Sequence, residues 1–177
     1  MPETRTIVRV FLASPGDLQP EREAVRAEIE DINENWSATV DCHFELLGWE
    51  DVSPGYGRPQ SIINADVDKC DLFIGLLWKR WGTPPDTKGD FTSGFHEEYK
   101  RALASCQRTG SPDIALFLKG IPDDQKMDAG PELQKVLNFR SEVERERSVL
   151  FKLFQDVDDI RQLLRHKIAS FVKDAQL

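Results

Sequence analysis

The feature that most constrains the fold is an apolar stretch near the middle of the chain, DLFIGLLW at residues 71–78. A strand with one face in water alternates apolar and polar residues, whereas this stretch is apolar almost without interruption. Strands that are buried on both faces of a parallel sheet have this composition. The stretch therefore predicts a central strand that is covered by helices on both sides.

Four other segments predict strands, and helical segments lie between them. The other strands are expected at residues 6–13, 39–50, 113–120 and 148–154. The helices are expected at residues 17–36, 59–68, 94–108, 131–147 and 157–174. This alternation predicts an α/β fold with right-handed crossovers. We expect a flavodoxin-like three-layer fold, with a five-stranded parallel sheet in the order 2-1-3-4-5 and helices on both faces.

The length of 177 residues predicts a single domain over residues 1–177. This domain is expected to stand alone or to form the N-terminal module of a longer protein. No apolar run reaches the ~18 residues of a membrane-spanning helix. Residues 1–12 lack the apolar core of a signal peptide. The predicted location is the cytoplasm, with no membrane partner.

The charge and the cysteines exclude several kinds of site. The chain has 23 lysines and arginines against 31 aspartates and glutamates, which gives a formal net charge of −8. That balance opposes binding to nucleic acid, which needs a basic surface. Cys42, Cys70 and Cys106 are odd in number and far apart, which argues against a disulfide framework or a zinc site. We expect buried free thiols and no metal.

The expected strand order also predicts where a ligand would bind. In such sheets ligands bind beyond the carboxyl ends of the strands, where the order reverses, here between the first and third strands. The loop after the first strand contains Ser14 and Gly16, whose backbone N–H groups are candidates for holding a phosphate. Asp17 is expected to cap the following helix. The loop lacks the P-loop pattern, so ATP hydrolysis is not supported.

The loop after the third strand leads to two adjacent carboxylates, Glu97 and Glu98. The apolar residues of the helix that they begin mark its sheet-packing face. Glu98 lies about 80° from the centre of that face and Glu97 about 180°. We therefore expect Glu97 to point into water and Glu98 to lie half-buried at the rim, where burial raises its pKa and the helix N-terminus lowers it. The alternative is that both simply complement the helix dipole.

Four ordered motifs in the chain resemble a known family. They are VRVFLASPGDLQPEREAVRAEI, WEDVSPGYGRPQSIIN, DKCDLFIGLLWKRWGTP and SGFHEEYKRAL. Together they are similar to the DUF4062 family, which is related to TIR domains and more distantly to nucleoside deoxyribosyltransferases. The resemblance covers roughly residues 7–104 at the level of motifs and implies a TIR-like fold.

The resemblance also implies a catalytic residue. In enzymatic relatives, a glutamate on the helix after the third strand acts on an N-glycosidic bond. The deoxyribosyltransferase pattern Ser-Gly-Thr-x-x-Glu is matched by Ser93, Gly94 and Glu98, while Phe95 replaces the threonine. The resemblance thus implies that Ser93 and Gly94 are substrate-binding residues. The missing hydroxyl favours cleavage over deoxyribosyl transfer. The motif and the helical spacing thus select the same residue, Glu98.

The chemistry that we expect is hydrolysis of NAD or a related nucleotide by a signalling or defence effector. Its transition state places positive charge on the ribose, which one carboxylate can stabilise or attack. Nicotinamide leaves from a cationic ring, so no general acid is needed, whereas most glycosidases use a carboxylate pair. We expect no cofactor, NAD as the substrate, and activation by assembly into a homo-oligomer.

Three residues after the third strand are candidates for nucleotide binding. An indole, from Trp78 or Trp81, would stack on a base, and Arg80 would meet the pyrophosphate. The structural alternatives are that Trp78 closes the core and that Arg80 is solvated. His96 is expected to face solvent.

The loop after the second strand is rich in glycine and proline and carries Trp49, Tyr56 and Arg58. In TIR relatives this loop gates the site and joins neighbouring subunits. The alternative function is therefore a catalytically inactive module that self-associates or docks on a partner protein.

Overall fold

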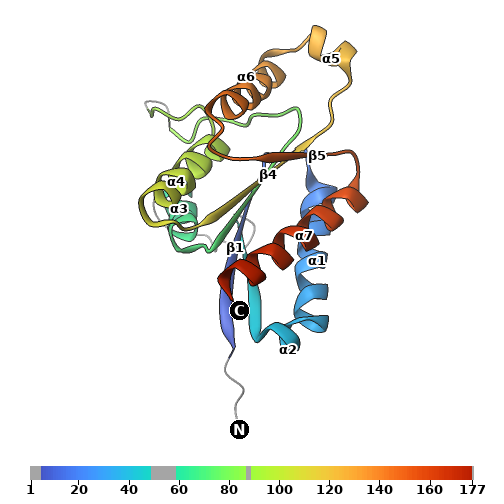
Figure 1. Ribbon diagram of the computed structural model, residues 1–177. Coiled ribbons are helices and arrows are strands. Elements are labelled where there is room, and N and C mark those ends of the chain that lie inside the picture. Colours follow the sequence, from blue (N-terminus) through green and yellow to red (C-terminus); the bar gives the residue numbers. More distant parts are fainter. Residues whose placement is uncertain (1–4, 49–58, 87–88, 177) are drawn as a thin grey trace.

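The computed structural model describes residues 5–48, 59–86 and 89–176. Five parallel strands form one sheet in the order β2-β1-β3-β4-β5, which confirms the predicted fold (Figure 1). The strands are β1 (Thr6–Ala13), β2 (Cys42–Leu47), β3 (Leu72–Leu77), β4 (Asp113–Lys119) and β5 (Phe151–Phe154). The order reverses between β1 and β3, so a crevice is expected at their carboxyl ends.

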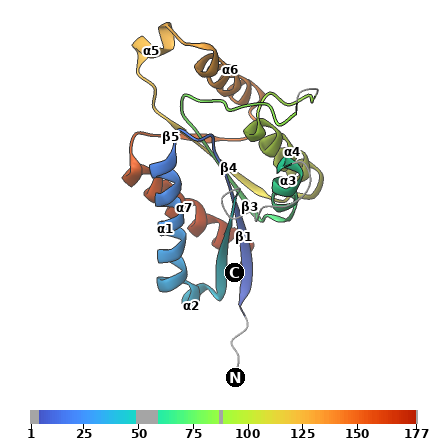
Figure 2. The same ribbon diagram turned by 180° about the vertical axis from the view of Figure 1, so that it is seen from behind.

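Helices cover both faces of the sheet, as Figures 1 and 2 show from opposite sides. One face carries α1 (Gln19–Asn35) and α7 (Val157–Ala175). The other carries α3 (Pro59–Lys69), α4 (Gly94–Thr109) and α6 (Pro131–Glu146). Every residue of β3 is buried, as the apolar stretch predicts.

The two faces of the sheet divide the core into two apolar clusters. In β1, Val10 and Leu12 belong to the cluster beneath α1 and α7. Phe11 and Ala13 belong to the cluster beneath α3, α4 and α6. Phe11 pairs in register with Phe73 of β3, and their rings stack at 5.8 Å. This alternation is the period-two geometry of a strand between two helical layers.

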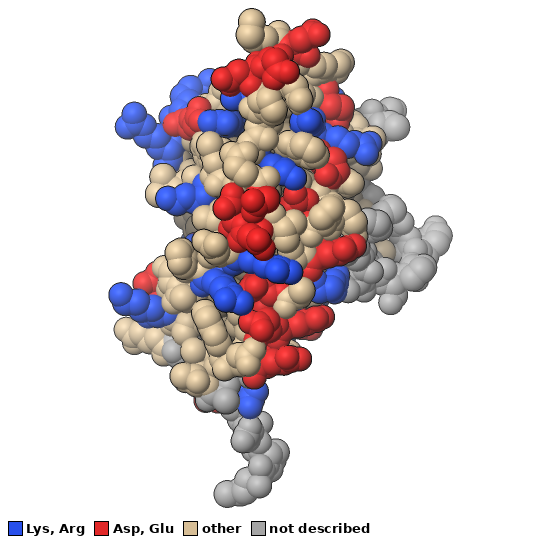
Figure 3. All heavy atoms as spheres, turned by 90° about the vertical axis from the view of Figure 1, so that its right-hand side faces the viewer, with Lys and Arg blue, Asp and Glu red and all other residues tan. Residues whose placement is uncertain are grey.

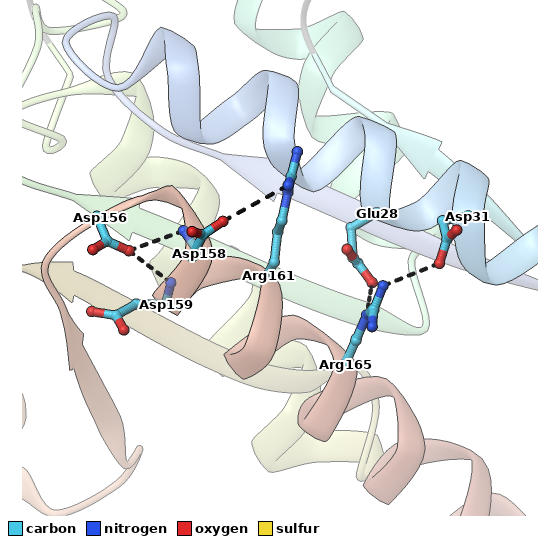
Figure 4. Close-up of polar contacts among 7 residues, drawn as sticks. All are labelled: Glu28, Asp31, Asp156, Asp158, Asp159, Arg161 and Arg165. Carbon is cyan, nitrogen blue, oxygen red and sulfur yellow. Dashed lines mark hydrogen bonds and ion pairs between the residues drawn. The ribbon is translucent and has the colours of Figure 1, made fainter.

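Ion pairs join α1 to α7 across the surface of the first face (Figure 4). The buried Glu28 carboxylate pairs with Arg165, whose Nη2 also lies 3.2 Å from Asp31 Oδ2. Asp156 caps α7 by accepting from the N–H groups of Asp158 and Asp159, each at 3.0 Å. The charged side chains on this face thus connect its two helices.

The boundaries of several elements differ from the predicted ones. A short helix α2 (Ser37–Val40) precedes β2 and is capped by Asp41, which has a left-handed φ of 50°. Another short helix, α5 (Asp123–Met127), lies between β4 and α6, where no helix was predicted. β5 begins three residues later than expected because residues 148–150 leave the sheet, and Leu150 is 88% exposed.

Two further features of the described residues are the burial of the cysteines and the lengths and polarity of the helices. Cys42 and Cys70 are buried free thiols, whereas Cys106 is partly exposed. Among the described residues, no helix is long and apolar enough to cross a membrane.

Gly75 in the middle of β3 allows α4 to pack closely on the sheet. A Cβ atom at this position would lie 2.6 Å from Leu116 Cδ2 and 3.2 Å from Phe95 Cε2. We predict that Gly75→Ala destabilises the protein by about 1–2 kcal/mol, because the core is overpacked. Urea unfolding measures this change.

Gly16→Ala is the matched control, since a Cβ at Gly16 would meet nothing within 4 Å. Both substitutions reduce the entropy of the unfolded chain similarly, so their difference isolates the overpacking. Equal unfolding free energies for the two variants would contradict the close packing described for Gly75.

Candidate functional site

A cavity of about 230 Å³ opens beyond the carboxyl ends of β1 and β3. Its walls come from the loop after β1, from α3, from residues 81–85 and from the first turns of α4. The lining residues are Phe11, Leu12, Ser14, Pro15, Gln60, Ile63, Trp81, Gly82, Thr83, Pro84, Pro85, Gly94, Phe95 and Glu98. The cavity lies where the strand order reverses, which is the predicted place for a ligand.

Glu98 is the only carboxylate among the residues that line the described cavity. Its side chain is buried, at 8% exposure. Gln60 Nε2 donates a hydrogen bond of 3.0 Å to Glu98 Oε1. Burial raises the pKa of Glu98 to about 7, although the Gln60 hydrogen bond and the Arg22 charge lower it and the Glu97 charge raises it further. Glu98 therefore changes its charge near neutral pH.

Glu97 does not point into water, so that prediction is wrong. It is only 5% exposed, and Asn64 Nδ2 donates to its Oε1 at 2.7 Å. The helical spacing considered packing against the sheet alone, whereas α3 packs beside α4 and its Asn64 reaches Glu97. The two glutamates differ in what they face: Glu98 faces the cavity, and Glu97 faces an amide of α3.

The start of α4 is fixed by Ser93 and Gly94. Ser93 is fully buried and caps the helix, since its Oγ accepts from the N–H of His96 at 3.1 Å. Gly94 lines the cavity, and a Cβ there would lie 2.8 Å from Gln60 Oε1. Ser93 thus sets the first turn of α4, and that turn brings Glu98 to the cavity.

Arg22 of α1 supports the loop after β1 and was missed in the sequence. It is buried, and its Nη1 donates to Ser14 Oγ at 3.0 Å and to the Ser14 carbonyl at 3.3 Å. Ser14 itself lines the cavity. Arg22 lies within the first of the four family motifs, but helical spacing alone does not show that its side chain turns back to a loop eight residues earlier.

Asp17 does not cap α1 as predicted. The helix begins at Gln19 with Leu18 at the cap position. Asp17 Oδ2 instead accepts from the backbone N–H groups of Lys79 and Arg80, at 3.0 and 2.9 Å. The residue therefore joins the loop after β1 to the loop after β3.

Trp81 forms a fixed wall of the cavity. Its ring is buried, and its Nε1 donates to Thr92 Oγ1 at 2.9 Å. The backbone N–H groups of Trp81 and Gly82 both donate to Glu132 Oε2 of α6 at 3.0 Å. Desolvation alone would raise the pKa of Glu132, but these hydrogen bonds and Lys135 hold it below its ordinary value. Glu132 was also missed in the sequence.

Several predicted binding residues do not line this cavity. They are Gly16, Trp78, Arg80 and Ser93. The Trp78 ring packs on the α1–α7 side of the core, with Lys79 Nζ and Lys119 Nζ at 4.2 and 4.5 Å from its centroid. Arg80 is exposed. A role for these four residues in binding a nucleotide stays a prediction, and the predictions for Trp49, Tyr56 and Arg58 lie outside the described residues.

His96 lines a different cavity from Glu98, and Trp81 borders both. It is half-buried rather than solvent-facing, and its ring contacts those of Trp81 and Phe91 at centroid distances of 5.6 and 5.7 Å. Burial, followed by the Lys100 charge, lowers its pKa. It lines a separate cavity of about 200 Å³ and has no place beside the catalytic candidate.

A larger cavity of about 640 Å³ lies beside the amino half of β4, between α4 and α7. Asp113 is its one described carboxylate, and the Lys167 ammonium lies 2.5 Å from Asp113 Oδ2. Because a buried carboxylate with a raised pKa is the better mark of a functional site, the smaller cavity is the stronger candidate. Across the described residues, no group of three or more His, Cys, Asp or Glu side chains is placed to hold a metal ion.

Comparison with known proteins supports the fold. A family model described as a domain of unknown function, DUF4062, matches residues 9–169. No curated protein matches the chain. The TIR domains of the activated Roq1 resistosome, which directly recognises the pathogen effector XopQ, are similar with a TM-score of 0.54 and 12% identity. That match covers 91% of this chain and 99% of the other.

A second solved structure is less similar. It is the general stress protein 14 of Treponema denticola in complex with FMN, with a TM-score of 0.36 and 14% identity over 96% of this chain and 99% of that chain.

The raised pKa of Glu98 predicts a pH-dependent contribution to stability. The group ionises near 4.5 when unfolded and at about 7 when folded, so folding binds a proton between these values. The stabilisation is complete below pH ~4.5 and is lost as the pH rises to ~7. We predict that the free energy of unfolding of Glu98→Gln, relative to that of the wild type, rises by on the order of 3 kcal/mol between pH ~4.5 and ~8.

Urea unfolding of both proteins across this pH range measures the gain. Glu23→Gln, on the exposed side of α1, supplies the baseline for replacing a glutamate by glutamine. A difference between wild type and Glu98→Gln that does not change with pH would show that Glu98 is not desolvated.

Proposed function

Because this chain belongs to the DUF4062 family, whose function is unknown, we propose a function from the cavity itself. The proposed activity is hydrolysis of the N-glycosidic bond of NAD or a related nucleotide, with Glu98 as the catalytic carboxylate. The observation that carries this proposal is the position of Glu98, buried and yet lining the cavity at the carboxyl ends of β1 and β3.

The proposed role of Glu98 is electrostatic or nucleophilic. As the bond to nicotinamide breaks, its electron pair leaves with the ring nitrogen, and positive charge develops on the ribose. The ionised Glu98 stabilises that charge or attacks the sugar carbon. Water then supplies the new hydroxyl group and releases a proton. Burial strengthens the attraction, because few waters remain to screen it.

A cavity with a single carboxylate favours a substrate whose leaving group is a cationic ring before the bond breaks. Glycosidases that expel an alcohol need a second carboxyl group to protonate it. Glu97 is turned toward Asn64 and is not among the residues of the described lining. Nicotinamide leaves as a neutral molecule without protonation, so the arrangement supports a pyridinium nucleotide over an ordinary glycoside.

The cavity suits one end of a dinucleotide. Its volume of about 230 Å³ is small, and its described lining contains no lysine or arginine. The proposed pose places the nicotinamide riboside between Ser14, Trp81 and Glu98, and leaves the phosphates outside. Arg22, behind Ser14, contributes positive charge without reaching the described lining.

The proposed context is a signalling or defence effector of the cytoplasm that is activated by assembly into homo-oligomers. The TIR domains that share the fold belong to a resistosome that recognises a pathogen effector. On the face that carries α1 and α7, acidic and basic side chains are interspersed (Figure 3). This mixed surface, with the formal net charge of −8, supports a protein partner over a nucleic acid.

The alternative is a catalytically inactive self-association module. The observation that favours it is the same lining, in which the described residues offer no cation to hold a pyrophosphate. Gly16, Trp78, Arg80 and Ser93, which were expected to bind the nucleotide, also lie outside it. The two functions are separated by measuring catalysis under conditions that promote assembly.

The first test is release of nicotinamide from NAD by concentrated protein with a crowding agent. We predict that Glu98→Gln lowers the rate by about 10²-fold or more, because the charge that stabilises the transition state is lost. Glu97→Gln should stay within about tenfold of the wild type, since its amide oxygen still accepts from Asn64. Chromatography of the products measures both rates.

Equal losses in these two variants would contradict the assignment of Glu98. If the wild type releases no nicotinamide under any assembled condition, the inactive module is the better account. Circular dichroism of each variant checks that a lost activity is not a lost fold.

The second test is the pH profile of the same reaction. Only the ionised Glu98 is active in this proposal, and burial raises its pKa to about 7. We therefore predict a rate that rises about tenfold per pH unit below ~6.5 and reaches a plateau above ~8. A rate that is constant from pH 5 to pH 8 would contradict the requirement for Glu98 ionisation.

A further inference from the structure

Gln60 of α3 both lines the described cavity and hydrogen-bonds Glu98. It is 8% exposed, in the first turn of the helix. Its Nε2 donates to Glu98 Oε1 at 3.0 Å and also lies 3.3 Å from Asn64 Oδ1. An amide nitrogen carries two hydrogens, so one group can serve both acceptors.

The orientation of the Gln60 amide follows from these partners. Both neighbours of its nitrogen are acceptors, and a flipped amide would place oxygen against oxygen. Asn64 is fixed in turn, because its Nδ2 donates to Glu97 Oε1 at 2.7 Å. The two amides of α3, four residues apart, thus hold the two adjacent carboxylates of α4 in different directions.

Gly94 leaves the room that this arrangement needs. A Cβ at Gly94 would lie 2.8 Å from Gln60 Oε1 and 3.9 Å from Glu98 Oε1. The residue is not among the glycines with positive φ, so its backbone does not by itself require glycine. A Cβ at this position would therefore displace the side chain of Gln60 rather than strain the backbone.

We propose that Gln60 is a positioning residue, which holds the Glu98 carboxylate toward the cavity, and that Gly94 is glycine so that Gln60 can reach it. The effect on catalysis rests on the function proposed above. The effect on Glu98 itself does not, because the hydrogen bond exists whether or not the cavity is catalytic. This difference allows the two proposals to be tested separately.

A residue that only fills space would act differently from a hydrogen-bond donor. Methionine has about the length and flexibility of glutamine and fills the same gap, but it has no donor. A donor to the ionised carboxylate favours the ionised form. Replacing Gln60 by methionine should therefore raise the pKa of Glu98, whereas loss of packing alone would not do so in a folded protein.

The experiment is an NMR titration of protein labelled with ¹³C at the glutamate carboxyl groups, with the Glu98 signal assigned by its absence in Glu98→Gln. We expect Gln60→Met to move the Glu98 titration upward by about one pH unit. The matched control is Gln134→Met, which removes a similar amide hydrogen bond, to Asn138, on the exposed side of α6. The control should leave the Glu98 titration unchanged.

A double-mutant cycle tests the role of Gly94. When introduced alone, Gly94→Ala should raise the pKa of Glu98, since the new methyl group displaces the Gln60 amide. In a Gln60→Ala background, where the amide is absent, the same substitution should change the titration by less than a third as much. Equal effects in both backgrounds would overturn the proposed role of Gly94.

The outcomes separate the two proposals. If the titration of Glu98 is the same in Gln60→Met and the wild type, Gln60 does not position Glu98. If it moves while the wild type releases no nicotinamide, the positioning stands and the proposed function fails. If the wild type is active, Gln60→Met should shift its pH profile upward by the same amount and lower kcat more than it changes KM.

Circular dichroism confirms that each variant folds. Should Gln60→Met not fold, Gln60→Asn gives the same test, because its shorter amide remains polar but does not reach Glu98 Oε1. An unmoved Glu98 titration in that variant would overturn the proposal equally.

Discussion

The burial of β3 on both faces is the constraint from which the arrangement of this protein follows. A strand without a polar face needs a helical layer on each side, and parallel strands place all crossovers over those faces. Because β1 and β3 are neighbours whose chains leave in opposite directions along the sheet, their carboxyl ends open into a crevice. Gly75 then lets Phe95 approach β3, and this contact sets how closely α4 packs on the sheet. The position of the cavity is thus a result of how the core packs.

Within that frame, the charge at the cavity is decided in the contact between α3 and α4. Burial opposes ionisation of Glu98, and the Gln60 donor and the Arg22 charge favour it. Asn64 draws the neighbouring carboxylate of Glu97 away from the cavity. The balance leaves one carboxyl group whose pKa, at about 7, lies in the physiological range. A buried polar contact between two helices that perturbs the pKa of a carboxyl group is typical of functional sites, and in the proposed function it would have a chemical use.

The sequence predicted the fold well because apolar periodicity reports on burial, and β3 is its clearest case. It also selected Glu98, which the structure places at the cavity. It failed where a residue's environment comes from a second neighbour far along the chain. Glu97 is covered by α3, and Asp17 binds backbone groups of the loop after β3. Gln60 lies within one of the family motifs, yet its role was not predicted, because it depends on a partner 38 residues away.

The hydrogen bonds from Trp81 and Gly82 to Glu132 make the shape of the cavity depend on α6. They attach one wall of the cavity to α6, a helix that follows β4 and contributes no residue to the described lining. A change of length or sequence in α6 would shift that wall and so alter which molecules fit, without any change among the residues that touch them. If the cavity binds a ligand as proposed, its selectivity would therefore evolve partly through changes in a helix that does not touch that ligand.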